Sequence, residues 1–177
     1  MSEKMIELAQ RAEKENPLGI EYVVCNVTEI GKIGTFDIVS AAFLFNYASS
    51  KETLLAMCRT VYDNLKSGGK LVISVNATPL YSPTNSMITR KYGYLISDLP
   101  LREGDSVEYS FFTGEHAFQI INYHWNKETY EWALRQSGFS EIIWQPPTIS
   151  QKGLEEYGVG FWQDFLKEPN FVCIKCG

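Results

Sequence analysis

The sequence predicts a doubly wound α/β fold, in which helices flank a mostly parallel sheet. Short runs that are almost entirely apolar, at residues 20–24, 36–44 and 71–75, are typical of strands buried inside such a sheet. Residues 54–65 place apolar side chains at helical spacing between the second and third of these runs. This alternation of strand and helix indicates parallel strands joined by crossover connections.

The chain is expected to open with a helix. Ser2 can cap this helix, and Asn16-Pro17-Leu18-Gly19 ends it. The linker at 28–35 is short and polar, so we expect little or no helix between the first two strands. Ser67-Gly68-Gly69 is expected to end the second helix, because glycine readily adopts the left-handed cap. The apolar face of the first helix consists of Met5, Leu8, Ala9 and Ala12.

The regular alternation stops at Pro79, although no linker divides residues 1–177 into two domains. Residues 79–118 combine turn residues with many aromatic side chains, and we expect them to form an insertion or lid. Two strands are expected at 107–112 and 118–125, the second returning to the main sheet. A helix ended by Gly138, a strand, another helix and a final strand should follow, at 126–136, 141–144, 154–166 and 171–175.

Composition excludes several classes of protein. The chain has 177 residues, 45% of them hydrophobic, which is enough for one packed domain and too little for two. The net charge is -5 and the Lys and Arg residues are scattered, whereas a nucleic-acid-binding protein usually presents a basic face. No run of about 18 apolar residues is present. We therefore expect a cytoplasmic protein without a nucleic-acid or membrane partner.

Four cysteines are present, and the last two form a C-x-x-C. A zinc site needs more ligands at close spacing, and only two histidines accompany these cysteines. Residues 173 and 176 also fall in an expected strand, where residues three apart face opposite sides. We therefore expect buried free thiols and no metal site. The cysteines are Cys25, Cys58, Cys173 and Cys176.

Three stretches, in this order and spacing, resemble class I S-adenosylmethionine-dependent methyltransferases. Residues 2–9 are similar to the helix after the second strand of that family, residues 36–47 to the fourth strand and its exit loop, and residues 65–71 to the turn before the fifth strand. The resemblance covers residues 1–76 and extends to the layout of the rest. It implies a Rossmann-like methyltransferase sheet, mostly parallel with an antiparallel C-terminal strand, and S-adenosylmethionine as the cofactor.

The resemblance also implies that the chain is truncated at its N-terminus. In this family a glycine-rich turn after the first strand holds the cofactor and an acid after the second strand binds the ribose, and neither is present here. Ser2 matches the serine that follows this acid in the family, so Met1 would be an internal methionine of a longer protein. We then expect weak or no binding of S-adenosylmethionine by this chain alone, and a free sheet edge through which two copies can form a homodimer.

The cofactor site is expected at strand exits, because open α/β sheets bind ligands beyond the carboxyl ends of their strands. The resemblance places Asn26 against the adenine amino group, with the backbone of Val27 beside the ring. It places Phe43 and Leu44 along the methionine part of the cofactor. The alternatives are an asparagine that only forms a turn, and a simple loop after the strand.

The substrate would meet the methyl donor at Asn46 and Tyr47. Residues 45–48 lack the Pro-Pro motif of methyltransferases that act on amino groups of DNA bases, so that substrate class is not expected. Aromatic side chains in and after the insertion suit a flat or apolar small molecule on this side of the fold, and they suit the core of a lid equally well. The further residues expected to bind substrate are Tyr81, Tyr123 and Trp125.

Two residues are candidates for taking a proton from the methyl acceptor. They are His124, which lies among aromatic residues, and Tyr47. The alternative for His124 is structural, because a lone histidine in a strand more often packs than reacts. Near the C-terminus, Gly158-x-x-Phe161-Trp162 is similar to the small-molecule branch of the family that includes toxoflavin synthase-like enzymes.

The leading hypothesis is methyl transfer to a nitrogen or oxygen of a small molecule by in-line displacement. The alternative is a non-catalytic fragment or degenerate methyltransferase-like protein that acts as a binding or interaction module. A different nucleotide-binding domain is disfavoured, because nothing in the sequence marks a phosphate site.

Overall fold

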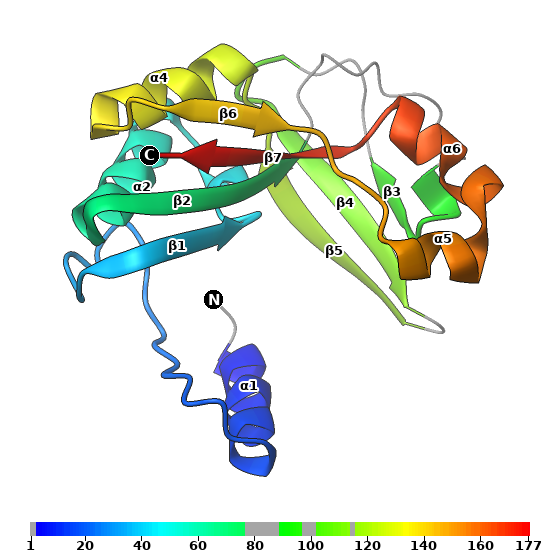
Figure 1. The fold of residues 1–177 in the computed structure, drawn as a ribbon, viewed down its shortest axis with the longest axis horizontal. Helices are drawn as coiled ribbons and strands as arrows, with labels where there is room; N and C mark the ends of the chain where they lie inside the picture. The colour runs from blue at the N-terminus through cyan, green and yellow to red at the C-terminus, as the bar shows by residue number, and fades with distance from the viewer. Residues whose placement is uncertain (1–2, 77–88, 97–101, 114–115) are drawn as a thin grey trace.

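The computed structural model describes residues 3–76, 89–96, 102–113 and 116–177. Its main sheet has four strands in the order β1 (Phe36–Ala42), β2 (Leu65–Asn76), β7 (Phe171–Cys176) and β6 (Ile142–Gln145) (Figure 1). Strand β2 is parallel to β1, and β7 is antiparallel to both β2 and β6. Three strands therefore run in one direction and the C-terminal strand runs in the other, which confirms the predicted sheet.

Helices α2 (Lys51–Asp63) and α4 (Lys127–Ser137) pack against each other and cover one face of this sheet. Ser50 caps α2 by accepting a hydrogen bond from the backbone of Thr53, and Gly138 ends α4 in the left-handed region that glycine adopts without strain. The core between these layers is formed by residues with almost no exposed surface. They include Phe45, Leu54, Leu71, Ile73, Leu134 and Ile174.

The other face of the sheet is open among the described residues, contrary to the expectation of strands buried on both faces. The register of the strands puts Ile38, Val72 and Ile143 on this face, and all three are exposed. Helix α1 (Glu3–Glu15) forms as predicted but buries none of its residues, and it stands apart from the sheet in Figure 1. Its apolar stripe therefore covers nothing within the described chain.

The predicted strand at 20–24 does not form. These residues have no strand beside them, and the backbone N–H groups of residues 18–20 are instead bonded to a side-chain oxygen of Glu13. Ile20, Val23 and Val24 are exposed. An apolar run makes a strand only when a neighbour accepts its backbone hydrogen bonds.

A second sheet is separate from the main one and contains β3 (Tyr94–Ile96), β4 (Ser106–Thr113) and β5 (His116–Tyr123), all antiparallel. The expectation that residues 118–125 return to the main sheet is therefore wrong, because β5 pairs with β4 along its whole length. Helices α5 (Gln151–Tyr157) and α6 (Val159–Lys167) lie next to this sheet (Figure 1).

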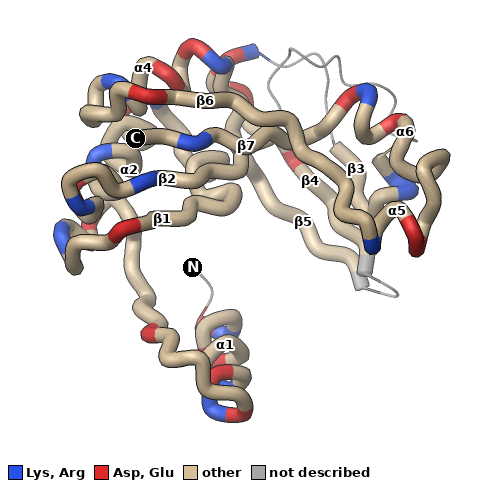
Figure 2. Tube along the Cα trace, viewed as in Figure 1, with Lys and Arg blue, Asp and Glu red and all other residues tan. Residues whose placement is uncertain are grey.

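Two helix boundaries also differ from the predicted ones. Helix α2 ends at Asp63, and Gly68 (φ +77°) lies inside β2, where the pairing with β1 shifts register. The predicted helix at 154–166 is divided into α5 and α6 by Gly158 (φ +76°). Among the described residues no helix is long and apolar enough to cross a membrane. Lys and Arg are mixed with Asp and Glu along the chain (Figure 2).

Candidate active site

The carboxyl ends of three strands meet at one edge of the main sheet. Ala42 at the end of β1 pairs with Ser74 near the end of β2, and Gln145 at the end of β6 reaches the same level across β7. Phe171, the first residue of β7, pairs with Asn76 there. Open α/β sheets bind ligands at this edge, so the residues that leave or enter these strands form the candidate site.

Phe43 leaves β1 in an unusual backbone conformation. Its φ of +55° lies in the left-handed region, which a non-glycine residue enters at a cost of about 1 kcal/mol or more. Its backbone N–H donates to the carbonyl oxygen of Ser74, which holds this conformation. The ring is 41% exposed and contacts the ring of Phe171 edge to face, with 5.9 Å between centroids. Strain held in this way is common at functional sites.

Asn46 lies one short helical turn further on, in a 3-10 helix over Phe45–Tyr47, and is completely buried. Its Oδ1 accepts from the backbone nitrogen of Asn76 and from the hydroxyl of Tyr130, each at 3.3 Å. Its Nδ2 has no hydrogen-bond partner among the described residues. Burial raises the pKa of Tyr130, so this hydroxyl stays protonated and acts as the donor. Tyr47, in contrast, is half exposed.

The second sheet is joined to this edge by a pair of amides. Asn76 donates from Nδ2 to Oδ1 of Asn122 at 3.2 Å, and Asn122 is buried near the end of β5. Trp125 makes a second link, because its Nε1 donates to the carbonyl oxygen of Ala48 at 2.8 Å. These bonds fix the hairpin of β4 and β5 beside the strand exits.

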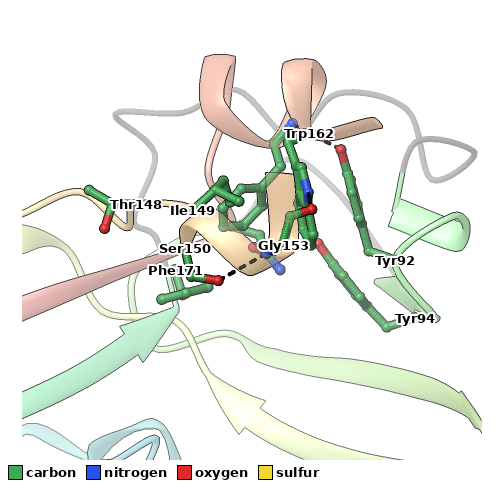
Figure 3. Close-up of a pocket in the computed structure, with 10 residues that line it drawn as sticks. Tyr92, Tyr94, Thr148, Ile149, Ser150, Gly153, Trp162 and Phe171 are labelled. Atoms are coloured by element: carbon green, nitrogen blue, oxygen red, sulfur yellow. Dashed lines mark hydrogen bonds between the residues drawn. The ribbon is translucent and has the colours of Figure 1, made fainter. Parts of the chain in front are cut away.

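A cavity of about 460 Å³ opens at the same edge, between β3, the α5–α6 pair and the start of β7. We call it the aromatic pocket, and its volume is typical of a small-molecule site. Figure 3 shows the rings of Tyr92 and Trp162 side by side, and their planes are 13° apart with centroids 5.9 Å apart. The aromatic side chains of the lining are Tyr92, Tyr94, Trp162, Phe165 and Phe171.

The polar groups of the pocket wall are mostly bonded to the wall itself. Trp162 donates from Nε1 to the carbonyl oxygen of Gly153, and Ser150 accepts from the backbone N–H of the same glycine (Figure 3). The hydroxyl of Tyr92 is bonded to the backbone of α6. Asn170 differs, because its Oδ1 is buried and has no partner within the described part of the chain.

Phe171 belongs to both parts of the candidate site, since it lines the aromatic pocket and contacts Phe43. The pocket therefore adjoins the exit of β1. Sequence reasoning did not single out Phe165 or Phe171 as site residues, and it included Tyr92 and Tyr94 only among the aromatic residues of the insertion. The aromatic density of 79–118 and the Phe161-Trp162 pair were the signals that pointed there, and Asn170 carried no signal at all.

Asn26 and Val27 are not brought to this edge by any contact in the structure. Asn26 is exposed, its Oδ1 accepts from the backbone and hydroxyl of Thr28, and its Nδ2 donates to Glu29. Its carbonyl oxygen also accepts from residues 29 and 30, so the asparagine forms a turn, which favours the alternative stated above. Val27 packs against the main core, as does Leu44.

The remaining predicted residues take structural positions or fall outside the structure. His124 is buried, and its Nε2 has no partner among the residues described. Desolvation lowers its pKa, while a hydrogen bond from the imidazole to the side chain of Asn126 and the charges of Asp105 and Glu103 oppose this shift. Tyr123 and Trp125 pack into the main core rather than lining the pocket. Tyr81 lies outside the described residues.

The described residues contain no group of three or more His, Cys, Asp or Glu side chains that could hold a metal ion. All four cysteines are free thiols. Cys58 and Cys176 are buried, and burial raises the pKa of both thiols to about 12, whereas Cys25 and Cys173 are only partly buried. A thiol with so high a pKa is inert at neutral pH.

Comparison with known proteins finds a family model that matches part of the chain. Residues 1–69 match the family described as "Methyltransferase domain". No curated protein matches the chain. The matched segment ends within β2, so it includes the exit of β1 and the strained Phe43.

Solved structures extend the likeness to the whole chain. One is a putative S-adenosylmethionine-dependent methyltransferase from Listeria monocytogenes, with a TM-score of 0.62 and 20% identity, covering 99% of this chain and 75% of that one. Another is an S-adenosylmethionine-dependent methyltransferase from Clostridium acetobutylicum, with a TM-score of 0.60 and 14% identity, covering 99% and 71%. A sugar N-methyltransferase from a Streptoalloteichus species has a TM-score of 0.62 and 16% identity, covering 99% and 67%.

These likenesses confirm the predicted Rossmann-like methyltransferase fold. Two of these neighbours are described as S-adenosylmethionine-dependent methyltransferases, which is the activity and the cofactor that the sequence predicts.

Proposed function

We propose that the chain carries out S-adenosylmethionine-dependent methyl transfer to a nitrogen or oxygen of a small molecule. The observation that carries this proposal is the contact between Phe43 and Phe171. It joins the exit of β1, where the family resemblance places the methionine part of the cofactor, to an aromatic pocket that can hold an acceptor. Donor and acceptor would then meet at the position of these two rings.

The residues present fit one half of the cofactor. Phe43 offers an exposed ring and a left-handed backbone turn beside the site of the sulfonium. Asn26 does not offer a free carboxamide to the adenine, because both of its side-chain atoms are bonded within its own turn. The proposal is therefore confined to the methionine end.

When bound, S-adenosylmethionine supplies a methyl group on a sulfonium, and the acceptor's lone pair takes this carbon as the carbon–sulfur bond breaks. The chain's own part is to position the acceptor and to exclude water, which the aromatic walls of the pocket suit. Tyr47, half exposed beside the exit of β1, would take the acceptor's proton from this side. His124, the other candidate base, is buried and does not line the aromatic pocket, so it is less suited to this role.

Support for the small-molecule branch comes from the Gly158-x-x-Phe161-Trp162 motif. Gly158 separates α5 from α6, and Trp162 lines the pocket with Phe161 in contact behind it. A sugar N-methyltransferase and a glycopeptide N-methyltransferase are among the structural neighbours, which favours nitrogen as the acceptor atom. The second sheet, tied to Asn76 through Asn122, would act as the substrate-side lid.

The test of this proposal measures the binding of S-adenosylmethionine to the chain. Saturation-transfer NMR should detect weak binding, with a dissociation constant on the order of millimolar. Phe43→Ala should abolish the signal. Phe36→Ala is the matched control, because this ring lies at the other end of the same strand with nearly the same exposure, 42% against 41%. No signal from the unaltered chain, or equal loss in both variants, contradicts the proposal.

A second candidate function is a binding or interaction module without catalysis. The observation that favours it is the exposed apolar surface of the first 47 residues. These residues include α1 and β1, and the outer edge of β1 has no paired strand among the described residues. The exposed apolar residues there are Met5, Leu8, Leu18, Ile20, Val23, Val24, Ile33, Phe36, Ile38, Phe43 and Tyr47. A homodimer formed through this surface is the form of the proposal that one chain can test.

A further inference from the structure

The shape of the aromatic pocket favours a flat ligand. Tyr92 and Trp162 stack on each other with nearly parallel ring planes, and Phe165 contacts both of these rings as well as the ring of Phe171. Aromatic walls of this kind bind ring systems through stacking and edge-to-face contacts. The pocket therefore recognises a ring rather than a flexible chain.

The charge around the pocket disfavours an ionic ligand. None of its described lining residues carries a charged side chain. Lys91 lies beside the lining, with its Nζ 5.0 Å from the ring centre of Tyr92, and it is already paired with Asp164. An anion that entered the pocket would lose its hydration without gaining a partner, which is costly in a cavity with apolar walls. An ammonium ion would gain only contact with ring faces, without a carboxylate among the described lining residues to pair with it.

The polar groups of the pocket favour a ligand that carries a hydrogen-bond donor. Asn170 comes directly before β7, and its Oδ1 is the buried side-chain oxygen of the lining that lacks a partner among the described residues. An amide oxygen can only accept. A buried acceptor without a donor is unfavourable by roughly 1–3 kcal/mol, so a ligand that supplies an N–H or O–H removes a penalty.

We propose that the aromatic pocket binds a flat, uncharged ring system whose N–H or O–H group donates to Oδ1 of Asn170, and that Asn170 sets this specificity. The identification of this ligand as the methyl acceptor rests on the proposed function. The binding preference itself does not, because it follows from the walls, the missing charge and the free acceptor. The pocket thus excludes carboxylates and phosphates.

Three probes that share one ring system separate these properties. 2-Naphthamide is uncharged and carries an N–H donor, 2-naphthoate is an anion without a donor, and 1-naphthylmethylammonium is a cation. Calorimetry on the 177-residue chain, without cofactor, should give measurable binding of the amide. Each ion should bind at least about tenfold more weakly.

Variants connect the binding to the pocket. Asn170→Leu keeps the size of the side chain and removes the acceptor, so the affinity for 2-naphthamide should fall roughly fivefold to tenfold. Trp162→Ala should abolish binding. Trp132→Ala is the matched control, because Trp132 is exposed on α4 and does not line the pocket. Far-UV circular dichroism verifies the folding of each variant, and Asn170→Leu decides the question if Trp162→Ala does not fold.

The proposal is overturned if 2-naphthamide does not bind, if either ion binds as tightly as the amide, or if Asn170→Leu leaves the affinity unchanged. Its failure is distinguishable from failure of the proposed function. Binding of 2-naphthamide without contact between the chain and S-adenosylmethionine would contradict only the methyltransferase activity. Contact with S-adenosylmethionine without binding of the amide would contradict only the ligand class.

Discussion

The hydroxyl of Tyr92 bridges two backbone groups that lie one turn apart in α6. It donates to the carbonyl oxygen of Phe161 at 2.9 Å and accepts from the backbone nitrogen of Phe165 at 3.1 Å. Tyr92 belongs to the segment before β3, so this single oxygen ties the second sheet to the C-terminal helices. The same ring forms one wall of the aromatic pocket, and the shape of the pocket therefore depends on this bridge.

Tyr92→Phe should destabilise the fold without removing the wall. The ring and its stacking on Trp162 are kept, while two hydrogen bonds worth about 1 kcal/mol each are lost. Urea denaturation should give a free energy of unfolding lower by about 1–2 kcal/mol. Tyr62→Phe is the control, because its hydroxyl makes no hydrogen bond to the described residues and its ring packs on Phe139 in either form. An equal loss in both variants would contradict the role of the bridge.

Asn64 performs a similar task at the start of the main sheet. Its Oδ1 accepts from the backbone of Ile33 and Gly34, and its Nδ2 donates to the carbonyl oxygens of Gly31 and Thr60. Asn64→Ala leaves these partly buried backbone groups without partners, so unfolding should become easier by about 2 kcal/mol in urea. Asn64→Asp keeps the two acceptor bonds and should cost less than the alanine variant. Equal stability of all three proteins would show that the linker at 31–34 does not depend on this side chain.

The sequence predicted correctly those elements whose apolar side chains pack against elements that are close to them in the sequence. The run at 36–44 and the run at 71–75 pair with each other, and the helix between them packs on the sheet that they form. The run at 20–24 has the same apolar character but no partner strand in the described chain, and the backbone of Ile20 at its start is bonded to the side chain of Glu13. The strand after residue 118 was placed in the wrong sheet because its partner is decided by the hairpin with β4, which an apolar pattern does not reveal.

The candidate site was predicted in part, for a related reason. Strand exits are readable from the sequence, and Phe43 lies at one. Asn46 also follows that strand, but its side chain points into the core, where it is completely buried. Asn170 precedes a strand that runs in the opposite direction, so its amino end lies at the carboxyl edge of the others. The direction of β7 therefore brings Asn170 and Phe171 to the site, and no local sequence motif predicts this position.

The stability of the fold should fall on mild acidification because of His124. Burial holds the pKa of His124 below its ordinary value of 6.5, despite the nearby charges of Glu103 and Asp105. The unfolded chain then binds a proton below about pH 6.5 that the folded chain does not, so stability present at pH 7.5 is lost as the pH falls through 6.5. Urea denaturation at pH 7.5 and 5.5 should detect this loss. His124→Leu should reduce this difference in stability, whereas the control His116→Leu should leave it unchanged. Retention of the full pH dependence in His124→Leu would assign the dependence to another group.

Gly153 in α5 is a position at which an added side chain would narrow the aromatic pocket, and Gly160 in α6 provides the control. A Cβ on Gly153 would lie 3.2 Å from Ile149 and 3.8 Å from the ring of Trp162, whereas a Cβ on Gly160 meets nothing within 4 Å. Both alanine variants gain helix propensity of up to about 1 kcal/mol. Gly153→Ala should weaken binding of 2-naphthamide in calorimetry, and Gly160→Ala should not. Unchanged binding in Gly153→Ala would place the ligand away from α5.

The open face of the main sheet should make the chain associate with itself. Ile38 and Val72 lie on this face in adjacent strands, where Ile38 pairs with Lys70 and Val72 with Ser40. Ile38 is 66% exposed, which is unusual for an apolar side chain in the middle of a strand. Sedimentation velocity should give a sedimentation coefficient that increases with protein concentration. Ile38→Lys places a charge on this face and should shift the distribution to the monomer, because a buried lysine without a partner opposes association. Leu166→Lys is the control, since Leu166 is also exposed but lies on α6. A chain that stays monomeric at all concentrations, or that responds equally to both lysines, would count against a homodimer through this face and would weaken the case for an interaction module.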